Sequence, residues 1–303
     1  MVAGIMTIGI WDAAVVTARA ATYAATLAAS GGVFFLIYNH SLLDSVCAGR
    51  IRRLIRVLAF IAALAGGAMI LATGASMSGD AGGLADPGLA RMILQAGEGR
   101  ASLVRLIGLI LIGGSLSGRR SPAAMTLLGS VAAATSFAWV GHVHALSALR
   151  GVWLPALVIV VHLLGVAFWL GALIPLLMVA RHADMSRIAA TSRRFGTAAL
   201  FVVGGLLAAG GGLLCLLLSD VSELWTDDYG RLALTKVLLV SCLLALAALN
   251  HLRLTPRLFA YDTGALRALK RSILAELAVA GCVLVVTAAM TTLAGPPALD
   301  MSH

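Results

Sequence analysis

The sequence predicts an all-α membrane protein, a bundle of eight transmembrane helices with both termini on the outer side. Of its 303 residues, 60% are hydrophobic and only 12% are charged, and the mean hydropathy is +1.00. Soluble domains carry about 25% charged residues. Eight apolar runs approach or exceed the ~20 residues that one membrane crossing needs. Because a backbone in lipid must satisfy its own hydrogen bonds, these runs are expected to be helices.

The eight runs follow one another with short connections. They cover residues 15–39, 54–76, 101–117, 122–142, 153–180, 196–219, 231–250 and 272–294. In the longest connection, Asp86-Pro87-Gly88 precedes LARMILQAGEG, which predicts a turn and a short interfacial helix. Small residues four apart, Gly204, Ala208 and Gly212, predict close packing of the sixth helix. We divide the chain into helices one to three (1–120) and helices four to eight (121–303).

Positive charge alternates between the connections. Every second connection is basic, holding Arg50, Arg52, Arg53 and Arg56, then Arg119 and Arg120, then Arg181, Arg187, Arg193 and Arg194, then Arg253, Arg257, Arg267, Lys270 and Arg271. The other connections and the termini hold most of the acids. Because cytoplasmic loops carry the excess of Lys and Arg, both termini are predicted to face outside. The net charge of +9 thus reflects orientation in a lipid bilayer, and nucleic acid is excluded as a partner because aromatic residues are few and not interleaved with basic ones.

Sequence motifs of ATP hydrolysis and of common hydrolases are missing. The two lysines, Lys236 and Lys270, follow Thr235 and Leu269, so no Gly-Lys pair is available for a phosphate-binding loop. Neither HExxH nor GxSxG occurs. The sequence therefore predicts a protein that is not an enzyme. Any transport must draw on the gradient of the transported species, the membrane potential or a partner protein.

Ionisable residues inside the runs are functional candidates, since each costs about 2.5–3.5 kcal/mol to insert. The clearest are His162, Lys236 and Glu276. Arg19, Arg105 and Arg231 lie nearer to the ends of their runs, where they are expected to snorkel to the interface. From their depths along the helices, we expect Lys236 to approach the outer acids Asp227 and Asp228, and Glu276 to approach the inner arginines.

Three histidines lie along the outer hairpin of runs four and five, and they predict a metal site. His142 and His144 are near the mouth of the hairpin and His162 is deeper, so the three form a ladder leading inward. Neutral imidazole suits copper and zinc. In a regular helix His142 and His144 would lie about 200° apart, so they share an ion only where the helix has frayed. Structural hydrogen bonding, haem ligation and proton relay remain alternative roles for His162.

Three segments carry a family resemblance: WVGHVHA (139–145), HLLGVAFWLGALIPL (162–176) and YGRLALTKVLLVSCLLALAALNHLRLTPRL (229–258). The last contains Gly230-Arg231, Lys236, Asn250, Arg253 and Pro256 in a characteristic order and spacing. In these segments the chain resembles the copper resistance protein D family of bacterial inner membranes. The resemblance covers about the second half of the chain, whereas the first half agrees mainly in its number of spans.

The resemblance implies a multi-pass inner-membrane protein that takes a copper ion from the periplasm and passes it towards the cytoplasm. By this resemblance, the family's outer ligand corresponds to His142, its intramembrane ligand to His162 and the aromatic residue that follows to Trp169. His144 has no counterpart in the family. It further implies a separate periplasmic copper-binding protein as partner. The predicted metal ligands are therefore His142, His144 and His162, with Trp169, Lys236 and Glu276 in supporting positions.

Two other functions fit the same residues. A membrane redox protein of the cytochrome b type would bind haem between two histidines on facing helices. A copper sensor or scaffold would bind the ion without moving it. Soret absorbance of the purified protein separates the first from a transporter, and copper flux in liposomes separates the second.

Overall fold

The computed structural model describes residues 9–117, 123–140, 154–217 and 228–293, with only the backbone for 213–217 and 228. Within these ranges the regular structure is helical and contains no strand. The elements are α1 (Ile10–Tyr38), α2 (Ser45–Ser78), η1 (Ala81–Leu84), α3 (Pro87–Gln95), α4 (Gly97–Ser115), α5 (Ala123–Thr135), η2 (Ser136–Trp139), α7 (Leu154–His182), α8 (Met185–Leu217), α10 (Asp228–Leu249), η3 (Asn250–Leu254), α11 (Thr255–Phe259) and α12 (Thr263–Leu293).

Six of the described helical segments are long and apolar enough to cross a membrane. They are α1, α2, α7, α8, the segment from α10 to α11, and α12. The third and fourth predicted runs overlap α4 and α5, which fall outside this group. The prediction of an all-α membrane bundle is confirmed, while the count of eight crossings stays a prediction.

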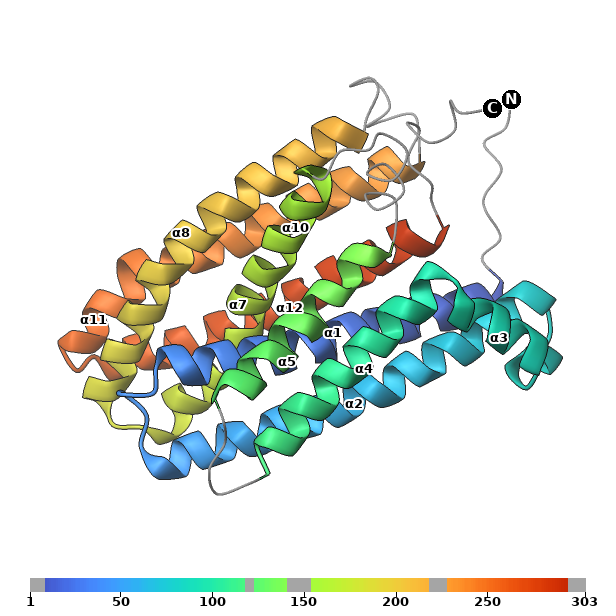
Figure 1. Ribbon diagram of the computed structural model, residues 1–303. Coiled ribbons are helices and arrows are strands. Elements are labelled where there is room, and N and C mark those ends of the chain that lie inside the picture. The colour runs from blue at the N-terminus through green and yellow to red at the C-terminus, as the bar shows by residue number, and fades with distance from the viewer. Residues whose placement is uncertain (1–8, 118–122, 141–153, 218–227, 294–303) are drawn as a thin grey trace.

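Helix α1 lies at the centre of the bundle and packs against α2, α5, α7 and α12 (Figure 1). In its most apolar 18-residue stretch 61% of the residues are buried, against 11% for α8 and for α10. The α1–α7 crossing depends on two glycines, because a Cβ on Gly171 would lie 2.6 Å from the Cα of Gly31. Gly108 of α4 and Gly129 of α5 approach each other in the same way.

The small residues of α8 do not produce the close packing that the sequence predicted. A Cβ on Gly204 or on Gly212 would meet no described atom within 4 Å. The reason is the peripheral place of α8: its small-residue face points away from the core, where no other described helix covers it. This prediction is therefore wrong for the described part of the chain.

The connections α1–α2, α7–α8 and α11–α12 come together at one end of the bundle, which we call the basic end. There Arg187 Nη1 lies 3.4 Å from Asp44 Oδ2, so the start of α8 meets the start of α2. Arg194 donates to Ser41 Oγ at 3.1 Å. Three of the basic connections that the sequence predicted thus lie at one end of the molecule.

Aspartates cap the helices that begin at the basic end. The Asp184 carboxylate accepts from the hydroxyl of Ser186 and the amide of Arg187, and these hydrogen bonds hold its pKa below the usual range. The amide of Ala265 and the Arg257 guanidinium lower the pKa of Asp262 in the same manner. Each carboxylate satisfies amides that an α-helix leaves open at its N-terminus, so α8 and α12 begin at defined positions.

At the opposite end, α3 forms where the sequence predicted a short helix. It begins after Asp86, whose carboxylate accepts from the amides of Gly88 and Leu89 at 2.7 and 3.1 Å. Nearby, Ser76 Oγ donates to Asp12 Oδ1 at 2.6 Å and ties the end of α2 to the start of α1. Asp12 and Asp86 belong to the parts of the sequence that hold most of the acids. Both therefore lie away from the basic end.

Candidate functional site

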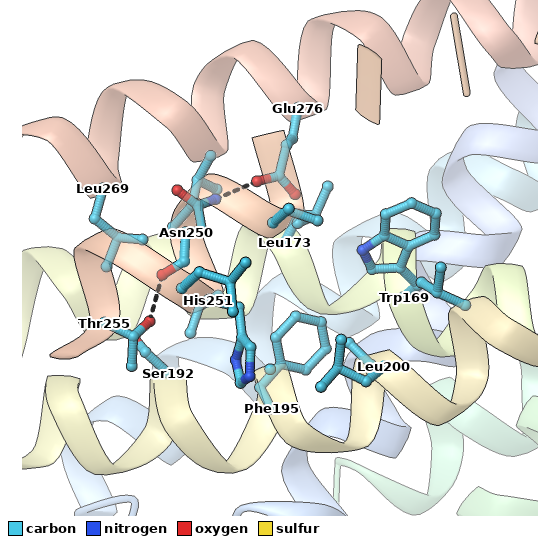
Figure 2. A pocket seen from close by; sticks show the side chains of 18 of the residues that line it. Trp169, Leu173, Ser192, Phe195, Leu200, Asn250, His251, Thr255, Leu269 and Glu276 are labelled. Atoms are coloured by element: carbon cyan, nitrogen blue, oxygen red, sulfur yellow. Dashed lines mark hydrogen bonds between the residues drawn. The ribbon is translucent and has the colours of Figure 1, made fainter. Parts of the chain in front are cut away.

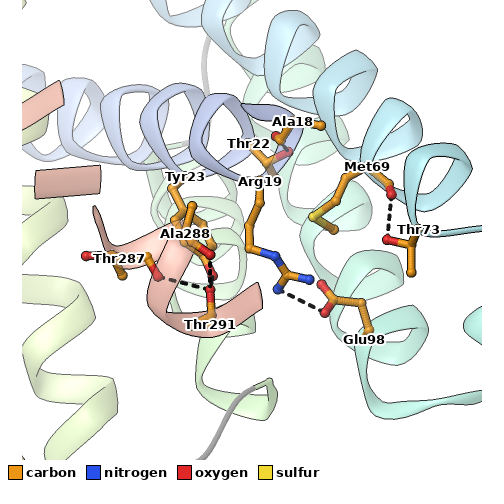
Figure 3. Close-up of polar contacts among 10 residues, drawn as sticks. All are labelled: Ala18, Arg19, Thr22, Tyr23, Met69, Thr73, Glu98, Thr287, Ala288 and Thr291. Carbon is orange, nitrogen blue, oxygen red and sulfur yellow. Dashed lines mark hydrogen bonds and ion pairs between the residues drawn. The ribbon is translucent and has the colours of Figure 1, made fainter. Parts of the chain in front are cut away.

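Two arginines that were expected to snorkel are instead buried at the end opposite the basic end. Arg19 is 7% exposed and Arg105 is 2% exposed. Arg19 Nη1 donates to Glu98 Oε2 at 3.1 Å, which joins α1 to α4 (Figure 3). Neighbouring helices cover α1, so its arginine faces protein rather than the membrane surface. The expectation of snorkelling is wrong for both residues.

Arg105 fixes the element that precedes two of the predicted ligands. Its Nε donates to Ser136 Oγ at 3.2 Å, and its guanidinium lies 4.2 Å from the centre of the Phe137 ring. Tyr23 of α1 meets that ring edge-on at 4.8 Å. These contacts hold η2 against α4 and α1. The segment 141–153, which contains both His142 and His144, continues from η2.

Of the three predicted copper ligands, His162 lies within the described residues, whereas His142 and His144 lie outside them. His162 sits on α7 and is half-buried, and its Nδ1 is buried with no hydrogen-bond partner among the described residues. The imidazole faces α8 at Gly210, where a Cβ would lie 3.8 Å from His162 Cε1. Glycine at that position leaves room beside the ring.

Lys236 of α10 is close enough to His162 for its charge to act on the imidazole. The two predicted site residues are thus related by charge across the space between α7 and α10, which sequence spacing had not predicted. The predicted acidic neighbours of Lys236 were Asp227 and Asp228, whose side chains lie outside the described residues. A positive charge beside an unpartnered imidazole disfavours a second positive charge at that ring.

A cavity of about 260 Å³ lies towards the basic end, between α7, α8, α10 and α12 (Figure 2). Its lining is mostly apolar, with Trp169 on the side of α7. Polar groups enter from four other elements: Ser192 from α8, Asn250 and His251 from η3, Thr255 from α11 and Glu276 from α12. Two supporting residues from the sequence, Trp169 and Glu276, thus share one cavity, away from Lys236.

Glu276 bonds to an amide rather than to the inner arginines. The residue is 2% exposed, and its carboxyl accepts a hydrogen bond from Asn250 Nδ2 (Figure 2). Among the described residues it forms no ion pair, so its expected approach to the arginines is wrong. The physical reason is that these side chains lie on different faces of α12. Arg267 and Arg271 are on its exposed side, whereas Glu276 points into the bundle.

The turn η3 shapes this cavity. It is a π-helical turn in which the amide of Thr255 bonds to the carbonyl of Asn250, and Thr255 Oγ1 donates to the same carbonyl at 2.8 Å. Pro256 follows at the start of α11 and has no N–H to continue the regular pattern. Such π-turns are frequent at functional sites because they redirect side chains.

Sequence reasoning missed Ser192 and His251 as cavity residues. The signal for η3 was present, since Asn250 and Pro256 belong to the segment that carried the family resemblance. Buried atoms without a partner among the described residues are Asn250 Oδ1, His251 Nδ1 and Ser192 Oγ. Because buried polar atoms are ordinarily hydrogen-bonded, these atoms indicate a place for a ligand or for water.

The described residues do not by themselves assemble a metal centre. No three His, Cys, Asp or Glu side chains among them come together in a way that could hold an ion.

Long apolar helices and buried ionisable residues define the chain as a polytopic helical membrane protein. Residues 10–152 match the family model of the N-terminal domain of copper resistance protein D-like proteins, and residues 189–290 match that of copper resistance protein D. The chain belongs to the copper resistance protein D family, which implies a role in copper resistance. The match to 10–152 extends the relationship to the first half of the chain. No curated protein and no solved structure gives a significant match.

Proposed function

We propose that this protein carries copper across the bacterial inner membrane, from the periplasm towards the cytoplasm, without hydrolysing ATP. Membership of the copper resistance protein D family supports copper as the cargo. The structural observation that carries the proposal is His162, an imidazole inside a spanning helix whose buried Nδ1 has no partner among the described residues. A polar group in this position is a candidate for the ion pathway by default.

His142 and His144 complete the proposed ligand set with His162. All three belong to the hairpin that leads into α7, and imidazole nitrogen is a good copper ligand. Lys236 then has a function in release, because its charge opposes the bound cation. A transported ion must be bound well enough to enter and weakly enough to leave. Either oxidation state of copper is compatible with this arrangement.

The proposed orientation places the basic end in the cytoplasm. Basic connections are retained on that side of bacterial inner membranes. Eight crossings, with α4 and α5 as two of them, then put both termini in the periplasm. In this orientation the membrane potential contributes ~2.3 kcal/mol per 100 mV for each positive charge that moves inward. The protein needs no catalytic group of its own for such transport, and copper reaches it from a separate periplasmic copper-binding protein.

Copper uptake into liposomes that contain this protein alone tests the proposal. We expect uptake by the wild type and a loss of about tenfold or more in His162→Ala. The matched control is His182→Ala, since His182 is exposed at the other end of the same helix and bonds only within its own turn. It should retain the wild-type rate.

Each contrary result has a definite meaning. Wild-type protein that binds copper but moves none is a sensor or scaffold. Equal uptake by the wild type and His162→Ala shows that His162 is not a ligand on the pathway. Soret absorbance in protein made with haem available would instead indicate the cytochrome b-type function.

A further inference from the structure

The cavity at the basic end encloses one carboxyl and no formal positive charge. Its lining from α7 and α10 is apolar, α8 adds Ser192, η3 adds Asn250 and His251, α11 adds Thr255 and α12 adds Glu276. His251 is the other titratable group of this lining, and its ring packs against the backbone of α8. Among the described residues, no charged side chain interacts with the Glu276 carboxyl.

A carboxylate in this position needs a positive charge from outside the protein. Burying an unpaired carboxylate in an apolar environment is costly. The amide of Asn250 contributes a hydrogen bond but no charge. Asn250 Oδ1 and Ser192 Oγ border the same space without partners among the described residues, so neutral oxygens are available beside the carboxyl. One proton or one cation at Glu276 neutralises the cavity.

The cavity lies on the side of α7 that carries His162. Trp169, which lines the cavity, comes seven residues after His162 on α7. Seven residues return to nearly the same face of a helix after about 10 Å. A cation that moves along this face from His162 towards the basic end therefore reaches Trp169 and then the carboxyl of Glu276.

We propose that the cavity is a second cation site, at which the passing copper ion and a proton compete for the carboxyl of Glu276. This inference rests on the proposed function. Without copper, the carboxyl carries a proton. When copper arrives, the O–H bond breaks, the proton leaves to water and the carboxylate oxygen binds the metal. One positive charge replaces another, so the enclosed charge of the cavity does not increase when the ion is monovalent.

Infrared difference spectroscopy of the full-length protein in nanodiscs tests this exchange at neutral pH. The probes are Cu(I), kept reduced without oxygen, and Cu(II) in a separate sample. For at least one of them we expect loss of the C=O stretching band of a protonated carboxyl and release of one proton per ion bound there. In Glu276→Gln both signals should be lost.

The control is Ser272→Ala, which changes a buried side chain one turn earlier on α12 and outside the cavity lining. It should keep the wild-type spectrum and proton release. The inference is overturned if neither form of copper removes a carboxyl band in the wild type, or if Glu276→Gln loses the same band.

Copper flux, measured separately, distinguishes the two proposals. Flux by the wild type without a carboxyl signal refutes the second site alone. A carboxyl signal without flux refutes transport and leaves copper–proton exchange at Glu276 intact.

Discussion

At the scale of single residues, the surroundings of His162 bear on how the proposed copper site would hold an ion and release it. The ring has a nitrogen without a partner in the described part of the chain, and the charge that acts on it is the ammonium of Lys236. Two positive charges in a partly buried site repel by an amount on the order of 1–2 kcal/mol. In this account, Lys236 weakens copper binding at His162 and speeds release.

We therefore expect Lys236→Met to bind copper more tightly than the wild type. The affinity should rise roughly tenfold, which corresponds to about 1.4 kcal/mol, as measured by competition with a copper chelator. Lys270→Met is the matched control, because Lys270 is the other lysine of the chain and belongs to the basic end. Unchanged affinity together with poorer folding would instead support a structural ion pair of Lys236 with an acidic residue.

The sequence could predict which residues to examine but not how they group. His162, Lys236 and Glu276 were identified by the cost of an ionisable group in an apolar run. Their neighbours depend on how the helices rotate about their axes, which composition does not determine. The sequence therefore placed Glu276 near arginines, whereas the structure pairs it with Asn250.

At the scale of elements, two glycines determine how closely α1 and α7 approach. The backbone of Gly31 occupies the space that a side chain on residue 171 would need. Helix α7 carries both His162 and Trp169, so its contact with the central helix positions the proposed outer ligand and one wall of the inner cavity together.

Replacing this glycine should destabilise the protein measurably. Gly171→Ala places a Cβ 2.6 Å from the Cα of Gly31, and overpacking of this kind costs about 1–3 kcal/mol. Gly204→Ala is the control, since a Cβ there meets no described atom within 4 Å. The free energy of unfolding in detergent should fall for the first variant and stay close to wild type for the second. Equal stability of both would show that the α1–α7 contact is looser than described.

Some elements were predictable from local chemistry, and others were not. Asp86-Pro87-Gly88 and the residues after it indicated a turn and then a short helix. Helix α3 begins already at Pro87, because an acidic cap followed by proline favours a helix start. The π-turn η3 escaped prediction although Pro256 marked its place, since the hydrogen-bond shift depends on neighbouring residues. The glycines of α8 misled the prediction because a small-residue pattern does not say whether a helix is central or peripheral.

At the scale of the whole molecule, the structure separates two kinds of chemistry along the bundle axis. One end has the buried side chains of Arg19 and Arg105. The other end has the exposed basic connections and the cavity with Glu276. An ion that enters by imidazole and leaves past a carboxyl would cross the membrane along α7, which contributes residues to both places.

X-ray absorption at the copper edge, together with metal analysis, tests the central claim most directly. Purified wild-type protein should contain bound copper with imidazole nitrogen in its first coordination sphere. In His162→Ala that nitrogen contribution should decrease, while His182→Ala should give the wild-type spectrum. Copper ligated by sulfur alone, or a nitrogen contribution that His162→Ala leaves unchanged, would contradict the account.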